Sequence, residues 1–409
     1  MNDADDMSHY DVAIIGGGLV GASLACALAP LGMKVVLVEA VAFKANSQPS
    51  YDDRTLALSA SSCRILESLG IWSALSGNAT PIREIQVREY NRPGRVILEP
   101  GELGLDRFGH VVEARVFGAA MLETIPRLEN LDFYCPVSVD AIEFGESAAT
   151  IHCVGEQEQI RLAARLVVGA DGANSFVREA LGIGVEQYDY GQSAVICNVT
   201  PEQDHRGRAF ECFTQTGPFA ILPHVEGRCG LVWCVPSDQV DAMMEMPERE
   251  FLEQANLRFG RHLGAFLKMG RRSSYPLKLV RALEDVRPRA VILGNAAHAI
   301  HPIGAQGFNL GLRDAAVLAE VLADSAGVDP GDPGLLKTYS EWRAPDHSGT
   351  IAYSDGLARM FSNPSGISAS ARTVGMLAHA FIPTLRRQLA VRAMGFRGRI
   401  PRLALGEPL

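Results

Sequence analysis

The 409-residue chain has few cysteines, and no two of them have the spacing of a metal-binding or redox motif. The eight cysteines are scattered between positions 26 and 234 without a C-x-x-C pair. Cys229 and Cys234 lie nearest to each other, but neither has a second pair or nearby histidines to complete a zinc site. We therefore expect reduced, mostly buried thiols in a cytoplasmic protein, and no structural metal.

The chain also lacks an excess of positive charge, a repeat of fixed period and a low-complexity tract. Its 38 Lys and Arg against 47 Asp and Glu give a net charge of −9. A nucleic-acid binder usually shows a basic stripe, so we expect no nucleic-acid partner and favour small molecules. With 47% hydrophobic and 21% charged residues, the composition is typical of a soluble globular protein of two packed domains.

Long uncharged runs are rare, and the one from Val12 to Met33 allows two interpretations. A membrane-spanning helix needs about 20 apolar residues, and Gly17-x-x-x-Gly21 is similar to a helix-dimer motif. However, three consecutive glycines weaken a helix interior, and the leader MNDADD is acidic where a signal peptide is basic. We therefore expect the buried core of a nucleotide-binding domain and not a membrane span.

The same run fits a strand, a turn and a helix. Residues 10–15 (YDVAII) are rich in β-branched side chains and end in glycines, which predicts a buried strand entering a tight turn. The pattern predicts a helix over 19–28 and a second strand over 34–39 (KVVLVE). Together they predict a right-handed parallel βαβ unit.

The turn of this unit carries the motif G-x-G-x-x-G at Gly16, Gly18 and Gly21. These glycines permit a tight turn, a close approach of the backbone to a pyrophosphate, and close packing of helix on strand. A diphosphate is favoured at the helix N-terminus by free amides and the helix dipole. Glu39 ends the second strand, where it can accept hydrogen bonds from a ribose. The site suits FAD or NAD, and the loop alone does not choose between them.

Three further segments indicate the rest of the fold. Residues 161–170 lead into Asp171-Gly172, and residues 290–294 lead into a glycine-rich loop and a helical pattern over 311–323. Residues 194–236 alternate polar and apolar side chains, which predicts an antiparallel sheet inserted into the first domain. The expected class is α/β: a Rossmann-like FAD-binding domain with an inserted antiparallel β-sheet substrate domain and C-terminal helices.

The C-terminal segment 386–402 carries six arginines and no acid, interleaved with apolar residues. A basic amphipathic helix of this kind can rest on an anionic membrane surface. A solvated surface helix whose arginines extend along its apolar side chains fits the same pattern. Both interpretations stay open from the sequence.

Longer motifs decide between the cofactors. LVVGADGANSFVRE (166–179) and VILGNAAHAIHPIGAQGFNLGLRDA (291–315) resemble two further signatures of the single-component aromatic-ring flavoprotein hydroxylases. The segments 50–72, 213–223 (FTQTGPFAILP) and 229–234 (CGLVWC) are similar to the FAD-dependent hydroxylases of ubiquinone biosynthesis. This resemblance covers nearly the whole chain and favours FAD.

The resemblance implies a monooxygenase that uses FAD, NADPH or NADH, and O₂, with a flavin C4a-hydroperoxide transferring oxygen to a polyprenylated phenol. Hydroxylation of 2-polyprenyl-6-methoxyphenol is the reaction expected. Another ring-position hydroxylase of the pathway, a non-catalytic FAD subunit of the biosynthetic complex, a halogenase and a prenyl-chain reductase are the alternatives. Other subunits of that complex, and a membrane contact through the basic tail, are the expected partners, at the cytoplasmic side of the inner membrane.

The resemblance also implies a set of cofactor contacts. Arginine guanidinium groups suit a phosphate or a flavin carbonyl, and Asn295, where the family commonly has Asp, keeps an acceptor for a ribityl hydroxyl. A loop over 302–307 is expected beside the flavin ring, with the next helix N-terminus at its pyrimidine edge. Asp314 is expected to support this loop. The cofactor-binding set is Gly16, Gly18, Gly21, Glu39, Arg54, Arg115, Asp171, Gly172, Gly294, Asn295, Pro302, Gly304, Gly307 and Asn309.

The inserted sheet is expected to supply an apolar substrate pocket, although some of its aromatic residues can equally fill the core. The pocket candidates are Phe210, Phe213, Phe219, Leu222 and Trp233. No catalytic acid or base is assigned, because a lone His224 is more often structural. His298 and His301 are three apart, but no acid or cysteine nearby in the sequence completes a metal site.

The domain division follows from these segments. The FAD-binding domain is expected in residues 8–80, 113–185 and 281–345. The substrate domain is expected in 81–112 and 186–280. Residues 346–409 are expected to form a C-terminal helical region with the basic tail.

Overall fold

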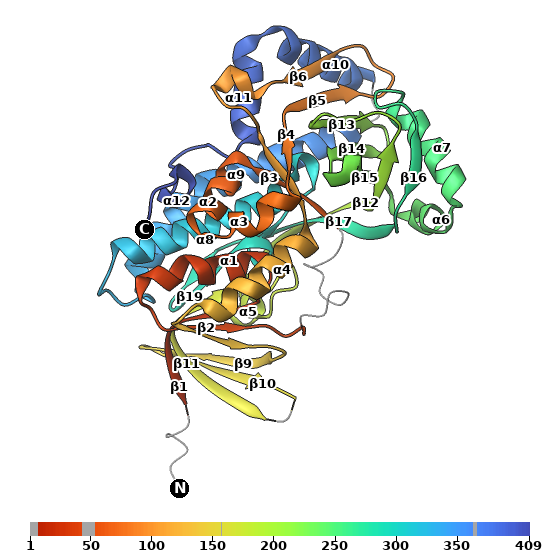
Figure 1. Ribbon diagram of the computed structural model, residues 1–409. Coiled ribbons are helices and arrows are strands. Elements are labelled where there is room, and N and C mark those ends of the chain that lie inside the picture. Colours follow the sequence, from red (N-terminus) through yellow and green to blue (C-terminus); the bar gives the residue numbers. More distant parts are fainter. Residues whose placement is uncertain (1–6, 43–53, 157, 363–365) are drawn as a thin grey trace.

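The computed structural model, shown in Figure 1, describes residues 7–42, 54–156, 158–362 and 366–409. Two large sheets lie at different ends of a central group of helices, and helices α10 and α11 lie beyond the second sheet. The mixture of a largely parallel sheet and a largely antiparallel sheet confirms the predicted α/β class.

The predicted βαβ unit is present. It consists of β1 (Ser8–Ile15), α1 (Leu19–Leu28) and β2 (Val35–Val38), and β1 pairs with β2 in parallel. The uncharged run is therefore buried strand, turn and helix. Among the residues that the structure describes, no helix is long and apolar enough to cross a membrane.

The first sheet has the order β18, β19, β11, β1, β2, β8. From β19 to β8 neighbouring strands are parallel, whereas β18 is antiparallel, and β10 and β9 add to β11 as an antiparallel hairpin. The predicted strands over 161–170 and 290–294 are confirmed. The bounds are β8 (Leu131–Tyr134), β9 (Ser138–Phe144), β10 (Ala149–Val154), β11 (Gln159–Gly169), β18 (Val286–Arg287) and β19 (Ala290–Ile292).

Side chains of β1 alternate between two buried layers. Val12 and Ile14 belong to the core formed with α1, α4 (Ala114–Thr124) and α8 (Gln306–Asp324). Ala13 belongs to the core on the other face, together with residues of β9 and β10. The predicted helix over 311–323 is thus confirmed as α8, which begins five residues earlier. Helix α8 packs against α1, and this contact positions the two helix N-termini.

The second sheet has the order β20, β17, β12, β15, β14, β13, β5, β6, with β16 paired to β12. The antiparallel prediction is confirmed for β12 to β15, while β13 and β5 are parallel. The bounds are β5 (Glu84–Glu89), β6 (Arg95–Leu98), β12 (Val185–Pro201), β13 (Arg208–Thr214), β14 (Gly217–Pro223), β15 (Cys229–Pro236), β16 (Phe266–Met269), β17 (Ser273–Ala282) and β20 (His298–Ala299).

The second sheet has two different faces. One face packs against α6 (Val240–Glu245) and α7 (Glu248–Phe259) in a dense aromatic core. The other face meets α9 (Pro333–Ser362), which contacts both β13 and β14. Because side chains on a strand alternate, each strand contributes half of its residues to each face.

Smaller elements connect the sheets. A three-stranded antiparallel sheet joins β3 (Thr55–Ser59), β7 (Gly109–Glu113) and β4 (Thr80–Ile82). The short helices are α2 (Ala60–Ser68), α3 (Trp72–Leu75) and α5 (Phe176–Ala180). All eight cysteines lie in the described part of the chain and are free, and all except Cys135 are buried, as expected.

The C-terminal region contains α10 (Gly366–Phe381), α11 (Pro383–Ala393) and α12 (Arg402–Leu405) after α9. The prediction of one basic amphipathic helix over 386–402 is wrong, because Gly395 and Gly398 adopt positive φ angles and break the chain between α11 and α12. Two of its arginines are engaged by the protein: Arg386 pairs with Glu102, and Arg399 lies over the ring of Trp342.

Candidate active site

A single cavity of about 2130 Å³ joins the glycine turn of the first domain to the face of the second sheet that meets α9. We call its two ends the nucleotide end and the apolar end. The nucleotide end includes Gly18, the loop over 302–307 and the N-terminus of α8. Of the predicted cofactor residues, the cavity wall includes Gly18, Arg54, Arg115, Gly172, Asn295, Pro302, Gly304, Gly307 and Asn309.

The glycine turn is built to bring backbone amides to the cavity. Gly16 has φ of 106°, and a Cβ atom there would overlap the carbonyl of Ala170. A Cβ atom on Gly21 would overlap the carbonyl oxygen of Gly16. Among the described residues no side chain caps the N-terminus of α1 at Gly18, so its first-turn amides can bind a ligand. A turn with this close packing and free amides fits the diphosphate of FAD.

Glu39 lies beside this turn. The amide of Gly17 donates to its Oε2 at 2.7 Å, and the amide of Val41 donates to its Oε1 at 2.8 Å. The carboxylate is thus held at the end of β2, beside the turn. The ribose contact of Glu39 stays a prediction.

Asp171 has the capping role that the sequence suggested as one of two. It accepts a hydrogen bond from the amide of Val177 at 3.0 Å, and Ser175 caps α5 through the amide of Arg178. The buried guanidinium of Arg178 donates to the carbonyls of Ala173 and Ala296, and it thereby joins two cavity loops. A direct contact of Asp171 with the cofactor stays a prediction.

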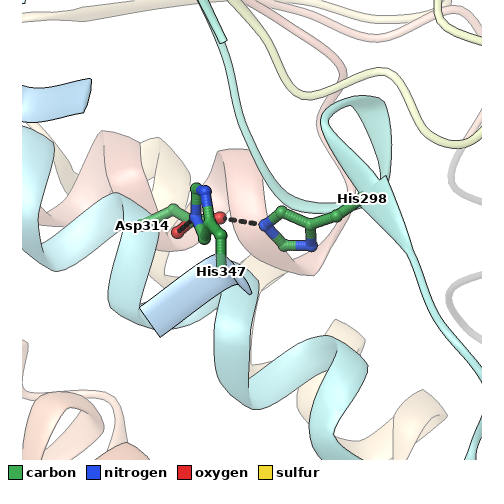
Figure 2. Close-up of side chains that lie close together, drawn as sticks. All are labelled: His298, Asp314 and His347. Atoms are coloured by element: carbon green, nitrogen blue, oxygen red, sulfur yellow. Dashed lines mark hydrogen bonds and ion pairs between the residues drawn. The ribbon is translucent and has the colours of Figure 1, made fainter. Parts of the chain in front are cut away.

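Figure 2 shows a buried cluster beneath the nucleotide end in which Asp314 of α8 lies between His298 and His347. His298 Nε2 and His347 Nε2 are each 2.7 Å from an oxygen of Asp314. Arg343 Nε also donates to Asp314 at 2.7 Å, and the amide of Gly294 donates at 3.2 Å. Asp314 thus supports the turn at Gly294, and its expected support of the loop over 302–307 stays a prediction.

No acid lies close to His298 in the sequence, but the fold brings Asp314 of α8 and His347 of α9 beside it. The cluster has the residue types of a metal site, but both carboxylate oxygens already accept hydrogen bonds, one of them from a guanidinium. Burial alone would raise the pKa of Asp314, yet its interactions with His347, Arg343 and His298 lower it well below 3.8. The arrangement is that of a buried ion network that fixes the Gly294 turn.

The loop over 302–307 has a strained backbone. Gly304 has φ of 68°, and Ala305 has φ of 52°, which is uncommon for a residue with a side chain. No side chain caps α8 at Ala305, so its first amides are also available. Burial lowers the pKa of His301 to about 4, so this side chain is neutral beneath the loop. An uncapped helix end here suits the negative charge of a reduced flavin.

The side chain of Asn309 is engaged by the protein. Its Oδ1 accepts from the amide of Ser59 at 2.9 Å, and its Nδ2 donates to the carbonyls of Ala57 and Ala305 at 2.8 and 2.7 Å. The carboxamide therefore ties β3 to the start of α8. The predicted cofactor contact at Asn309 would therefore be made by the backbone amides at the start of α8 and not by its side chain.

Arg54 and Arg115 both lie on the cavity wall. Arg54 is stacked over Tyr275, with its guanidinium carbon 5.0 Å from the ring centre. Arg115 pairs with Glu113, which also lies 3.0 Å from Nε2 of His224. The hydrogen bond from His224 lowers the pKa of Glu113 below 4.5. His224 thus joins β7 to the turn after β14, which is the structural role that the sequence favoured.

The apolar end separates the predicted pocket residues. Phe213 and Leu222 line the cavity, and Phe210 borders both the cavity and the α7 core. The prediction is wrong for Phe219 and Trp233, which are 0% and 2% exposed and pack in the core against α7. Strand alternation explains the error, because Phe219 is one residue away from the cavity-facing Pro218 and Ala220.

The part of the apolar end that is formed by helices, and one acidic residue, were not predicted from the sequence. Phe361 of α9 stacks on Phe213 with ring centres 3.6 Å apart, and Met376, Leu389 and Arg392 come from α10 and α11. No local pattern indicates these distant contacts. Glu211 also lines the cavity, and stepping back two residues from Phe213 along β13 would have placed it there.

The chain is similar in sequence to a known protein family and to several named proteins. The sequence model of an FAD binding domain family matches residues 9–352. "Ubiquinone hydroxylase UbiL" of Rhodospirillum rubrum is 40% identical over 406 residues, which cover 98% of this chain and 93% of that protein. "3-demethoxyubiquinol 3-hydroxylase" of Escherichia coli is 33% identical, over 94% of this chain and 98% of that protein.

Solved structures share the fold. The p-nitrophenol 4-monooxygenase PnpA of Pseudomonas putida superposes with a TM-score of 0.78 at 19% identity, over 96% of this chain and all of that chain. PqsL of Pseudomonas aeruginosa gives 0.76 at 22% identity, over 90% of this chain. At these identities the likeness shows the fold alone.

Proposed function

Because the chain belongs to the FAD-dependent hydroxylase family of ubiquinone biosynthesis, we propose that it hydroxylates the aromatic ring of a polyprenylated phenol, with 2-polyprenyl-6-methoxyphenol as the substrate. It is an FAD-dependent monooxygenase, of a class that typically uses NAD(P)H and O₂. The observation that carries the substrate proposal is the single cavity that joins the nucleotide end to a large apolar wall.

The residues divide the work between the two ends. The amides of α1 would hold the diphosphate and those of α8 would stabilise the flavin, which would supply the activation of O₂. Phe213, Phe361 and Leu222 enclose the phenol ring and exclude water. Met376 and Leu389 extend the apolar wall to α10 and α11, which suits a prenyl chain.

A membrane contact forms part of the proposal, but at α10 and α11 and not through a continuous tail helix. Val374, Phe381 and Ile382 are 67%, 79% and 45% exposed there, and Arg387 is exposed beside them. Exposed apolar side chains next to a positive charge are the combination that binds anionic lipid. The contact would place the protein at the cytoplasmic side of the inner membrane, where other subunits of the biosynthetic complex can bind.

Genetic complementation tests the reaction. Strains blocked at each ring hydroxylation of the pathway are transformed with the gene, and the accumulated quinone precursors are identified by mass. We expect restoration in the strain that lacks hydroxylation of 2-polyprenyl-6-methoxyphenol. Restoration of a different strain assigns the hydroxylation to another ring position. The Escherichia coli relative named as a 3-demethoxyubiquinol 3-hydroxylase makes that reaction the specific alternative. Restoration of none, with a flavin-loaded protein, contradicts the proposed function.

A further inference from the structure

Glu211 is an acidic side chain in the middle of the apolar end. It lies on β13 between Val87 of β5 and Ala220 of β14, and both neighbours line the cavity. Along the strand, Ala209 and Phe213 occupy the same face. The carboxyl group is thus surrounded in the sheet by apolar side chains on four sides.

This carboxyl group has no partner in the protein. Within residues 7–42, 54–156, 158–362 and 366–409, no hydrogen bond or ion pair holds it, whereas Glu113 at the other end is bound by His224 and Arg115. Enclosing a carboxyl group without a hydrogen bond costs free energy. A ligand that donates a hydrogen bond in the cavity would offset this cost.

Tyr353 of α9, Arg392 of α11 and Cys234 of β15 share this part of the cavity wall with Glu211. The guanidinium carbon of Arg392 is 5.5 Å from the ring centre of Tyr353. Burial, with a smaller effect of Glu211, raises the pKa of Tyr353 to about 12, so its hydroxyl stays protonated. The Cys234 thiol also stays protonated, because burial raises its pKa.

The charged residues of the neighbouring strand β5 are engaged elsewhere. Arg88 donates to the backbone carbonyl of Phe259, and Glu89 pairs with Arg372 at 3.0 Å. The charge of Glu211 affects the protonated phenol of Tyr353 and the protonated thiol of Cys234, while the guanidinium of Arg392 lies over the Tyr353 ring.

The strand face that carries Glu211 also meets the flavin loop. Ala209 and Phe213, two residues to either side, belong to the same apolar cluster as Ile303. Ile303 lies within the loop over 302–307, which is predicted to pass beside the flavin ring. A phenol held between Glu211 and this loop would have its ring close to the oxygenating centre.

We propose that Glu211 accepts a hydrogen bond from the phenolic hydroxyl of the substrate and takes its proton during hydroxylation, an inference that rests on the proposed function. The O–H bond breaks, the proton passes to a carboxylate oxygen, and the electron pair stays on the phenolate oxygen. No oxidant takes part in this step. The phenolate raises electron density at the ortho and para carbons, which electrophilic oxygenation requires.

The electrostatics of the pocket support this role. Burial raises the pKa of Glu211 from 4.5 to about 7. The shift makes the carboxylate a base stronger by about 300-fold while leaving it partly ionised near neutral pH, as suits a general base. The protonated hydroxyl of Tyr353 and the charge of Arg392 are available to stabilise the phenolate.

Substitution at position 211 tests the kinetic consequence with 2-geranylphenol as substrate. In Glu211→Gln we expect kcat/KM to fall by about 100-fold or more. The wild-type kcat/KM should decline as pH falls below about 7, because the base must be ionised, and this decline should be absent in Glu211→Gln. Glu211→Asp should restore part of the rate together with the pH dependence. Glu250→Gln, exposed on α7, is the control and should match the wild type.

A binding experiment on the oxidised holoenzyme tests the hydrogen bond without turnover. The perturbation of flavin fluorescence gives the affinity for 2-geranylphenol and for its methyl ether, which lacks the donor. Below pH 7 the preference for the phenol should fall by about 10-fold in the wild type, because a neutral acceptor binds more weakly than a carboxylate. Glu211→Gln should show a small preference that does not change with pH.

The outcomes separate the two claims. If the wild type oxidises 2-geranylphenol and Glu211→Gln keeps its rate and pH dependence, the role of Glu211 is wrong and the proposed function stands. If flavin-loaded wild type oxidises neither this phenol nor the pathway phenols, the proposed function is wrong. The role of Glu211 is then judged by the binding experiment alone. If the preference of the wild type for 2-geranylphenol over its methyl ether does not change with pH, the role of Glu211 is wrong as well.

Discussion

The nucleotide end and the apolar end of the cavity are built from different chemistry. The nucleotide end is built on the turn from Gly16 to Gly21, where added Cβ atoms have no room, and on two helix N-termini that no side chain of the described residues caps. At the apolar end the wall is made of side chains from β13, β14, α9, α10 and α11. One end therefore depends on the absence of side chains, and the other on their size.

The two ends also treat charge differently. Below the nucleotide end, the carboxylate of Asp314 is surrounded by positive groups and has a lowered pKa. At the apolar end, the carboxyl of Glu211 lacks such partners in the described chain, and burial raises its pKa to about 7. The first carboxylate is fixed as a structural anion, and the second is able to exchange a proton near neutral pH.

The largest expected effect comes from breaking the buried network. Asp314→Asn takes the anion from two histidines and leaves Arg343 paired with Asp346 alone, so we expect the free energy of unfolding to fall by about 3–5 kcal/mol. Because the folded pKa of Asp314 lies below the unfolded value, its contribution is present above about pH 4 and lost as pH falls further. Urea unfolding at several pH values measures this. Asp324→Asn, a half-exposed position on the same helix, should cost about 1 kcal/mol or less.

Sequence reasoning reached the nucleotide end because its chemistry is local. The turn from Gly16 to Gly21, α1 and Glu39 lie within about one βαβ unit, where spacing alone fixes their geometry. The partners of Asp314 were not predictable in the same way. His298 comes from β20, and Arg343 and His347 come from α9, so they meet Asp314 only because both elements pack beside α8.

The next prediction tests whether the glycine turn requires the absence of side chains. In Gly21→Val the new side chain would overlap the carbonyl of Gly16, so we expect FAD affinity to fall by at least about 100-fold, or about 3 kcal/mol. The flavin content of the purified protein and titration with FAD measure the change. Gly77→Ala, which has open space around it, should leave the preparation yellow. A yellow Gly21→Val protein would contradict the assignment of this turn to the diphosphate.

The apolar end shows why its residues were only partly predicted. The alternating pattern over 194–236 gives the strands but not which face meets the cavity, because both faces of the sheet are covered. Phe219 and Trp233 are as apolar as Phe213, yet they lie on the α7 side. Only the position of α9 distinguishes the two sets.

A smaller effect tests that assignment of faces. Ala220→Phe places a large side chain in the cavity, so we expect KM for 2-geranylphenol to rise by about 30-fold while FAD content stays unchanged. Phe219→Leu, one residue earlier, should lower the free energy of unfolding by about 1–2 kcal/mol and leave KM within about twofold. Steady-state kinetics and urea unfolding separate the two. A raised KM in Phe219→Leu alone would reverse the assignment.

The smallest expected effect lies where the apolar end reaches the surface. Phe381 is 79% exposed at the end of α10, while Met376 of the same helix lines the cavity. If this helix rests on lipid, Phe381→Ser removes apolar contact with the membrane, and binding to anionic phosphatidylglycerol vesicles should weaken by about 10-fold. Vesicle sedimentation measures the change, and Leu257→Ser, equally exposed on α7, is the matched control. Equal weakening by both variants would mean that α10 has no special role. A loss confined to Phe381→Ser would link the apolar end of the cavity to the membrane contact proposed for α10.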